Sequence, residues 1–202
     1  MTEIIKIDLN GMLERGDKII LDLGCGNSKG QGRIGIDRLD LPTVDIVADI
    51  DNGLGFLPDN SVDEIHSRSF IEHIENLELF MAEVTRVLKK GGICSLFVPH
   101  FSNPYYYSDY THKNFFGLYT FYYFVEPDHQ LARKVPVFYT NIRIDVRSIK
   151  LVFSSPFPKR NRVKKWLEKI FNRSAYMQEL YEENFTYIFP CYGLDVVFSP
   201  SK

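Results

Sequence analysis

The sequence predicts an α/β domain built on a mostly parallel sheet, and three observations support this prediction. Short apolar runs alternate with turn residues and with one clear amphipathic helix, which is the order of βαβ units. The first strong run, residues 19–23, ends in a glycine turn, as strands of open α/β sheets do beside a ligand. The 202 residues suffice for one such domain, and 45% apolar with 25% charged residues is a globular composition.

Strands are expected wherever a short apolar run lies between turn residues. Beyond residues 19–23, such runs occupy residues 34–37, 44–49, 62–66, 93–98, 142–153 and 194–198. Helical spacing of apolar residues predicts helices at 77–88, ending at Gly91-Gly92, at 113–124 with Thr111 as N-cap, and at 161–171 and 175–184. We find no linker between these elements, so residues 1–202 are predicted to form a single domain.

Two connections are too short for the helices that normally join parallel strands. Eight residues separate Gly26 from Gly35 and six separate Asp37 from Val44, whereas a parallel crossover usually needs about a dozen or more. Shortened or missing helices are therefore expected after the first two strands. Because bare apolar sheet surface is costly, we expect the N-terminal segment, residues 161–184 or the second subunit of a homodimer to cover that face.

Glycine and acidic residues follow three neighbouring strands of the predicted sheet. The first strand runs into Gly24-Cys25-Gly26, where glycine lets the backbone approach a ligand closely. Asp37 ends the second strand and could accept both hydroxyls of a ribose. Asp49 ends the third, where its carboxylate could receive an adenine amino group while Ile50 packs against the ring. Ligands bind at the carboxyl ends of such strands, so the pattern predicts an adenosyl site.

The ordered motifs LDLGCG, GID, ADI, LPDNSVDEI, EHI and EVTRVLKKGGICSLFVP resemble class I S-adenosylmethionine-dependent methyltransferases. The similarity covers roughly residues 19–99 and is greatest to the branch that contains ubiquinone and menaquinone C-methyltransferases. It implies a Rossmann-like sheet of seven strands with an antiparallel last strand, for which residues 194–198 are the candidate. It also implies S-adenosyl-L-methionine as coenzyme.

The resemblance assigns roles to individual residues of this chain. Asp22, Gly24 and Gly26 would line the methionine half of the coenzyme, and Ser67 would face its amino group. Asp37 would hold the ribose, and Asp49 with Ile50 the adenine. The neighbouring Cys25 and Arg38 complete the predicted coenzyme site.

Two other functions remain open at this point. A nicotinamide-dependent oxidoreductase would need a third glycine where the chain has Lys29, and an acid about 20 residues on, whereas Asp37 follows Gly24 closely. A protein that binds S-adenosylmethionine without turning it over would keep the same coenzyme motifs. The titratable residues of the acceptor segment favour an active methyltransferase over such a binding protein.

The acceptor is expected to bind at residues 100–140, and half of Phe101–Phe124 is aromatic. His112 is the candidate general base, oriented by Asp109, and His100 is the third titratable group there. Alternatively, Asp109 or Thr111 caps a helix and His112 only packs. The aromatic residues form core, a lid over an apolar or planar acceptor, or a contact with lipid. A small molecule, a sugar and a lipid-linked glycan all remain candidate acceptors.

Charge and cysteine content restrict the remaining possibilities. A net charge of −2 disfavours nucleic-acid binding, although residues 159–173 form a basic helix with Trp166 that suits peripheral membrane contact or a solvated face. Three cysteines without paired spacing predict neither a metal site nor disulfides. With no apolar leader, the chain is expected in the cytoplasm. Residues 1–99 would bind the coenzyme, and residues 159–190 would form a helical insertion before the last strand.

Overall fold

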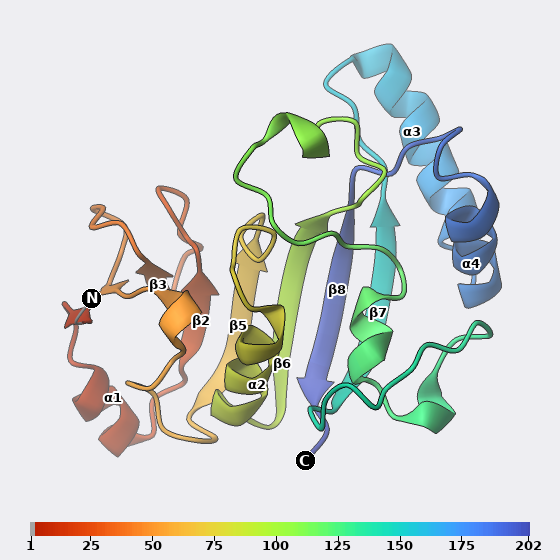
Figure 1. The fold of residues 1–202 in the computed structure, drawn as a ribbon. Helices are drawn as coiled ribbons and strands as arrows, with labels where there is room; N and C mark the ends of the chain where they lie inside the picture. The colour runs from red at the N-terminus through yellow and green to blue at the C-terminus, as the bar shows by residue number, and fades with distance from the viewer. Residues whose placement is uncertain (1–2) are drawn as a thin grey trace.

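The computed structural model describes residues 3–202 and contains one eight-stranded sheet in the order β1-β4-β3-β2-β5-β6-β8-β7 (Figure 1). The strands are β1 (Ile4–Ile5), β2 (Ile20–Leu23), β3 (Ile34–Asp37), β4 (Ile46–Val47), β5 (Val62–Arg68), β6 (Leu88–Pro99), β7 (Ile144–Val152) and β8 (Gly193–Pro200). β4, β3, β2, β5 and β6 are parallel, and β8 lies antiparallel between β6 and β7. The mostly parallel sheet with an antiparallel last strand is confirmed, and β1 adds an eighth strand at one edge.

Four α-helices accompany the sheet: α1 (Leu9–Arg15), α2 (Leu77–Val87), α3 (Pro158–Phe171) and α4 (Ala175–Asn184). Short 3-10 turns lie at η1 (Ile50–Asn52), η2 (Tyr106–Ser108), η3 (Thr120–Phe124) and η4 (Pro127–His129). The side chain of Asn76 caps α2 by accepting from the backbone of Leu79, and α2 buries its apolar face on the sheet. Across residues 3–202, none of the helices has the length and apolar character needed to span a bilayer.

One face of the sheet carries the main core. Leu23, Ser67, Leu96, Val196 and Ile149 are paired across β2, β5, β6, β8 and β7, and all five are buried. The four helices and the aromatic segment of residues 100–140 contribute to the same apolar cluster. Packing on this face therefore holds the whole domain together.

The opposite face is polar and open over the same strands. The neighbouring row consists of Arg68, Phe97, Asp195 and Lys150, again paired across β5, β6, β8 and β7. Arg68, Asp195 and Lys150 are exposed, and the Arg68 guanidinium lies 4.1 Å from the centre of the Phe97 ring. The side chains of this face border a shallow surface hollow. The sheet is therefore covered by helices on one side only.

The two short connections lack helices, as predicted, but they do not leave a large apolar sheet face that needs another cover. Within the described residues, 24–33 and 38–45 contain no helix, which confirms the missing helices. The expectation that a large apolar face would need another cover is wrong, because that face alternates into polar side chains. The apolar packing described on this face consists of a small cluster of Cys25, Val44 and Val47, with Leu41, and of Phe97 beneath Arg68.

Several element predictions need correction. Residues 113–119 are not helical, Thr111 caps no helix, and only η3 forms within the predicted helix at 113–124. Gly91-Gly92 lies inside β6 rather than at a helix end. Position 92 favours glycine because a Cβ there would lie 3.0 Å from the carbonyl oxygen of Asp63 in β5. The predicted strand at 44–49 shrinks to β4. Residues 1 and 2, where the predicted domain begins, lie outside the described range.

Candidate active site

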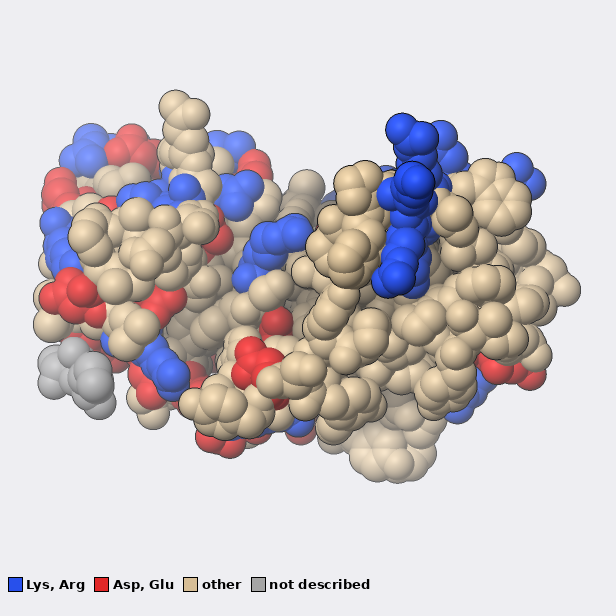
Figure 2. All heavy atoms as spheres, turned by 90° about the horizontal axis from the view of Figure 1, so that it is seen from above, with Lys and Arg blue, Asp and Glu red and all other residues tan. Residues whose placement is uncertain are grey.

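A cavity of about 500 Å³ opens at the carboxyl ends of β3 and β4. It is lined by residues from both strand ends, from the loop after β5 and from the aromatic segment: Asp37, Arg38, Ala48, Asp49, Ile50, Asp51, Phe70, His73, Ile74, Tyr110, Thr111 and Lys113. Figure 2 looks down on this edge, where the surface is hollowed between the two halves of the molecule. Four predicted coenzyme residues, Asp37, Arg38, Asp49 and Ile50, therefore share one cavity with residues of the predicted acceptor segment.

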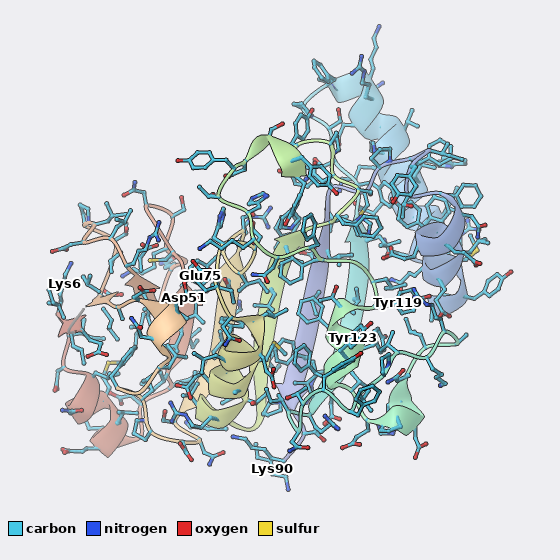
Figure 3. The ribbon with its side chains drawn as sticks, in the orientation of Figure 1. Lys6, Asp51, Glu75, Lys90, Tyr119 and Tyr123 are labelled. Carbon is cyan, nitrogen blue, oxygen red and sulfur yellow. The ribbon has the colours of Figure 1, made fainter. Side chains whose placement is uncertain are left out.

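The two strand-end carboxylates are held in place by backbone N–H groups. Asp37 accepts from Gly26 at 2.9 Å through Oδ2 and from Leu39 at 3.0 Å through Oδ1. Asp49 caps η1 by accepting from Asp51 at 3.2 Å. Asp51 in turn accepts from the backbone of Glu75 at 2.7 Å, and these two side chains lie close together at the rim (Figure 3). The adenosine half of the predicted site is thus fixed by the loops themselves.

The glycine turn lies beside the cavity but does not line it. Gly24 has a φ of +66°, and a Cβ there would lie 2.2 Å from the Phe70 ring, so this ring packs directly on the turn. Sequence reasoning missed Phe70, which follows β5 with no motif of its own. Its aromatic ring closes the space between Gly24 and the cavity.

The remaining predicted coenzyme residues support the turn. Asp22 accepts from the backbone of Gly30 at 2.7 Å and faces Arg33, and the Ser67 hydroxyl donates to the carbonyl of Leu23 at 3.0 Å. Cys25 packs into the small cluster on the opposite sheet face, and burial raises the pKa of its thiol to about 11. The structure does not bring these three side chains into the cavity.

The side of the cavity formed by the predicted acceptor segment carries a chain of hydrogen bonds around Thr111. Its hydroxyl donates to Asp109 Oδ1 at 2.5 Å and lies 2.9 Å from Nδ1 of His73. His112 lies behind this wall, with Nδ1 2.9 Å from the carbonyl oxygen of Tyr106 and Nε2 3.6 Å from Asp109. The ring centres of His73 and His112 are 4.8 Å apart. The structure thus brings together His112 and Asp109 as predicted.

His100 lies elsewhere. It is fully buried, with Nε2 3.0 Å from Glu182 Oε2 on α4 and Nδ1 2.8 Å from the Ser102 hydroxyl. The other oxygen of Glu182 accepts from the backbone of Leu118 at 2.8 Å. The structure therefore separates His100 from the His112 and Asp109 pair and gives it a buried structural contact.

The aromatic segment divides into two parts. Phe116, Leu118, Phe121 and Phe124 belong to the core, which fits the core interpretation for this half. Tyr105, Tyr107, Tyr110 and Phe115 are exposed, and Tyr110 stands at the cavity rim. Of these exposed rings, the one that lines the cavity is Tyr110.

Glu72 and His73 are further site residues to which sequence reasoning gave no role. His73 lines the cavity, and Glu72 is 1% exposed behind it. Burial raises the pKa of the Glu72 carboxyl to about 7 and lowers that of His73. The motif EHI contains both residues, so the signal was present, but no partner for them was visible in the sequence.

Part of this site lies in a region that is similar to a known protein family. A family model described as a methyltransferase domain matches residues 35–96, which span β3 to β6 and include Asp37, Asp49 and His73. No curated protein matches the sequence.

Solved structures resemble the whole chain. A SAM-dependent methyltransferase from Archaeoglobus fulgidus is 18% identical with a TM-score of 0.57, over 94% of this chain and 92% of that one. One from Mesorhizobium loti is 14% identical, with a TM-score of 0.53 over 94% of each chain. Coclaurine N-methyltransferase, bound to N-methylheliamine and SAH, is 15% identical with a TM-score of 0.53, over 95% of this chain and 69% of that one. At these identities the likeness shows the fold, which is that of class I methyltransferases.

Proposed function

We propose that this protein binds S-adenosyl-L-methionine and transfers its methyl group to a small-molecule, sugar or lipid-linked acceptor. One observation carries the proposal: a single cavity joins Asp37, Asp49 and Ile50, from the ends of two adjacent parallel strands, to His73 and Thr111 of the acceptor side. The matching family model and the S-adenosylhomocysteine bound by a structural neighbour support the same coenzyme. We also propose that the protein is located in the cytoplasm and that it belongs to the branch of the family that contains the quinone C-methyltransferases.

The coenzyme would lie along the strand ends. Asp37 would accept the ribose hydroxyls and Asp49 the adenine amino group, with Ile50 against the ring. The methionine half would pass over Gly24 toward Ser67. Since the Phe70 ring now packs on Gly24, coenzyme binding would move that ring aside. Lys29 is not free for the coenzyme carboxylate because its ammonium pairs with Asp45 at 2.7 Å.

Methyl transfer needs alignment more than activation, because the sulfonium is already a strong electrophile. Holding the acceptor in line with the methyl group contributes roughly 7–11 kcal/mol where positioning is good. For a hydroxyl acceptor, His112 oriented by Asp109 is the proposed general base. Its ring lies next to His73, which forms part of the cavity wall.

Calorimetry and product release test this function. Wild-type protein should bind S-adenosylmethionine and S-adenosylhomocysteine, and Asp37→Asn and Asp49→Asn should each weaken binding about 10- to 100-fold, as expected for lost charged hydrogen bonds. Asp195→Asn, on the open sheet face, is the matched control and should bind normally. Release of S-adenosylhomocysteine with an acceptor panel that includes quinone precursors would establish transfer. Binding without any release would support the non-catalytic alternative, and no binding at all would contradict the proposal.

We also propose that α3 contacts an anionic membrane surface. Val163 and Trp166 are 58% and 62% exposed on this helix, whereas Leu167 and Phe171 are buried. The helix stands out from the body (Figure 1), and Lys and Arg side chains gather over it (Figure 2). Exposed aromatic and basic side chains together suit the headgroup region of a bilayer. Flotation with anionic liposomes at low salt should carry the protein upward, and Trp166→Ala should weaken this; failure of wild type to float would contradict the proposal.

A further inference from the structure

Three side chains behind the cavity wall converge on one small space. Glu72, His73 and His112 each offer one potential ligand atom, and these atoms all lie within 4.8 Å of one another. Glu72 and His73 come from the loop after β5, and His112 comes from the aromatic segment. The backbone carbonyl of Glu72 accepts from Lys113 at 2.7 Å and from Asn114 at 3.1 Å, which fixes the two segments together.

The hydrogen bonds of His73 fix which of its nitrogens carries the proton. The Thr111 hydroxyl donates to Asp109, so its oxygen is left to accept from Nδ1–H of His73. In the neutral ring this leaves Nε2 with a lone pair.

His112 is fixed in the same tautomer by a different partner. The carbonyl oxygen of Tyr106 can only accept, so the nitrogen 2.9 Å from it, Nδ1, carries a proton. The Nε2 atom faces Asp109 Oδ2 at 3.6 Å, which is also an acceptor. In the neutral ring the Nε2 lone pair of His112 therefore lies 3.6 Å from a carboxylate oxygen, an arrangement that a proton or a metal ion on Nε2 would stabilise.

Glu72 completes the set. Its side chain is 1% exposed, and among the described residues Oε2 has no hydrogen-bond partner. A buried carboxylate oxygen without a donor is costly unless a proton or a metal ion compensates for it. Glu72 thus adds a buried carboxylate with an unpaired oxygen to the two imidazoles of the cluster.

We propose that Glu72, His73 and His112 bind one divalent transition-metal ion, of the class that includes Zn²⁺, Mn²⁺ and Fe²⁺. Two imidazoles and one carboxylate suit such ions, and metal-ligating histidines typically have their other ring nitrogen hydrogen-bonded, as both are here. Metal–ligand bonds of roughly 2.0–2.2 Å require the three atoms to approach by about an ångström, a movement within the reach of side-chain rotation.

The site would select the acceptor, an inference that rests on the proposed function. Because His73 lines the cavity, an ion held by it would lie next to the cavity, which suits an acceptor with a coordinating hydroxyl. Binding to the ion would lower the hydroxyl pKa, and its proton would pass to water. The oxygen then forms the O–CH₃ bond as the S–CH₃ bond breaks, and that bond's electron pair stays on sulfur. With the ion bound, His112 would be a ligand, so the general-base role proposed above belongs to the metal-free protein.

Metal binding can be measured without any methyl acceptor. Protein stripped with a chelator would be titrated with Zn²⁺ by calorimetry and with Co²⁺ by visible absorption, which reports imidazole and carboxylate ligation. Wild type should bind one equivalent, and Glu72→Gln and His112→Ala should each weaken binding at least 10- to 100-fold. The exposed His129→Ala is the matched control and should bind as wild type does. Circular dichroism would establish that each variant is folded.

The outcomes separate this proposal from the proposed function. Binding of less than one equivalent by wild type, or equal binding by folded Glu72→Gln, would overturn the metal site. If S-adenosylmethionine binds but the metal does not, the proposed function survives and the site does not. If the metal binds but S-adenosylmethionine does not, the reverse holds.

Discussion

The two faces of the sheet differ in almost every respect, although the same strands make both. On one face the strands bury a continuous apolar layer under helices, and on the other they present Arg68, Asp195 and Lys150 to solvent. Parallel sheets are usually covered on both faces, and their strands are then apolar throughout. β5, with the sequence VDEIHSR, alternates instead. Because buried and polar side chains alternate along the strands, the open face needs no cover from the two missing helices.

The largest difference in stability between the two faces is expected at two neighbouring residues of β7. Leu151 is buried on the covered face, and Lys150 is exposed on the open one. Leu151→Ala should lower the free energy of unfolding by about 2–5 kcal/mol through lost burial and a cavity. Lys150→Ala should change it by less than about 0.5 kcal/mol. Urea denaturation of both variants measures the difference, and a similar cost for both would mean that the open face is covered in solution.

A second test compares two glutamates, with metal removed by a chelator. Burial raises the pKa of Glu72 to about 7, above its unfolded value of 4.5, so the unfolded chain ionises first as pH rises. The unfolding free energy should therefore fall between about pH 4.5 and 7, by up to about 3 kcal/mol, and stay low above that. Glu72→Gln should remove this fall and be more stable than wild type at pH 8.

Glu64, on the open face, supplies the control of opposite sign. Hydrogen bonds from Lys18 and then His66 lower its pKa, so its contribution is present above the unfolded pKa and is lost as the pH falls. Glu64→Gln should therefore leave the loss of stability between pH 4.5 and 7 in place. A Glu72→Gln variant that keeps the wild-type pH profile would contradict the assignment to Glu72.

A third test examines the glycine turn, whose adjacent residues face opposite sides. Gly24 contacts Phe70 from the covered side, while Cys25 packs on the other. Gly24→Ala should cost about 2 kcal/mol or more, because it adds a steric clash to an unfavourable φ. Gly16, with a φ of +71° but open space around it, isolates the backbone cost, and Gly16→Ala should lose only about 1 kcal/mol.

Thermal denaturation would compare the two glycine variants. Phe70→Ala combined with Gly24→Ala should restore part of the lost stability, because it removes the ring that the new methyl group meets. If the double variant were no better than the sum of the single changes, Phe70 would not be the obstacle.

The smallest effect is expected at the one large apolar ring of the polar row. Arg68 covers Phe97, which is buried on an otherwise open face. Arg68→Ala should cost about 0.5–1 kcal/mol through the lost cation–π contact and shielding. Arg68→Lys should retain part of that stability in the same urea titration, and a neutral Arg68→Ala would show that the contact contributes little.

The sequence predicted those parts of the structure that depend on local pattern. Asp37 and Asp49 meet in one cavity because each follows a parallel strand, and parallel strands end at one edge. The helix expected at 113–124 failed because distant partners engage its backbone: the N–H of Leu118 donates to Glu182, and those of Lys113 and Asn114 donate to the carbonyl of Glu72. The proposed role of Glu72 became visible only because the fold brings it close to His112, 40 residues further along the chain. Such contacts leave no periodic trace in a single sequence.

The carboxylate of Glu182 restricts which segments of this protein can be exchanged independently during evolution. It ties α4 to the end of β6 through His100 and to the aromatic segment through Leu118. Exchanging either segment alone for that of a distant relative would strand a buried charge, a loss of about 3–5 kcal/mol. The two segments should therefore be exchanged together in any hybrid with a related protein.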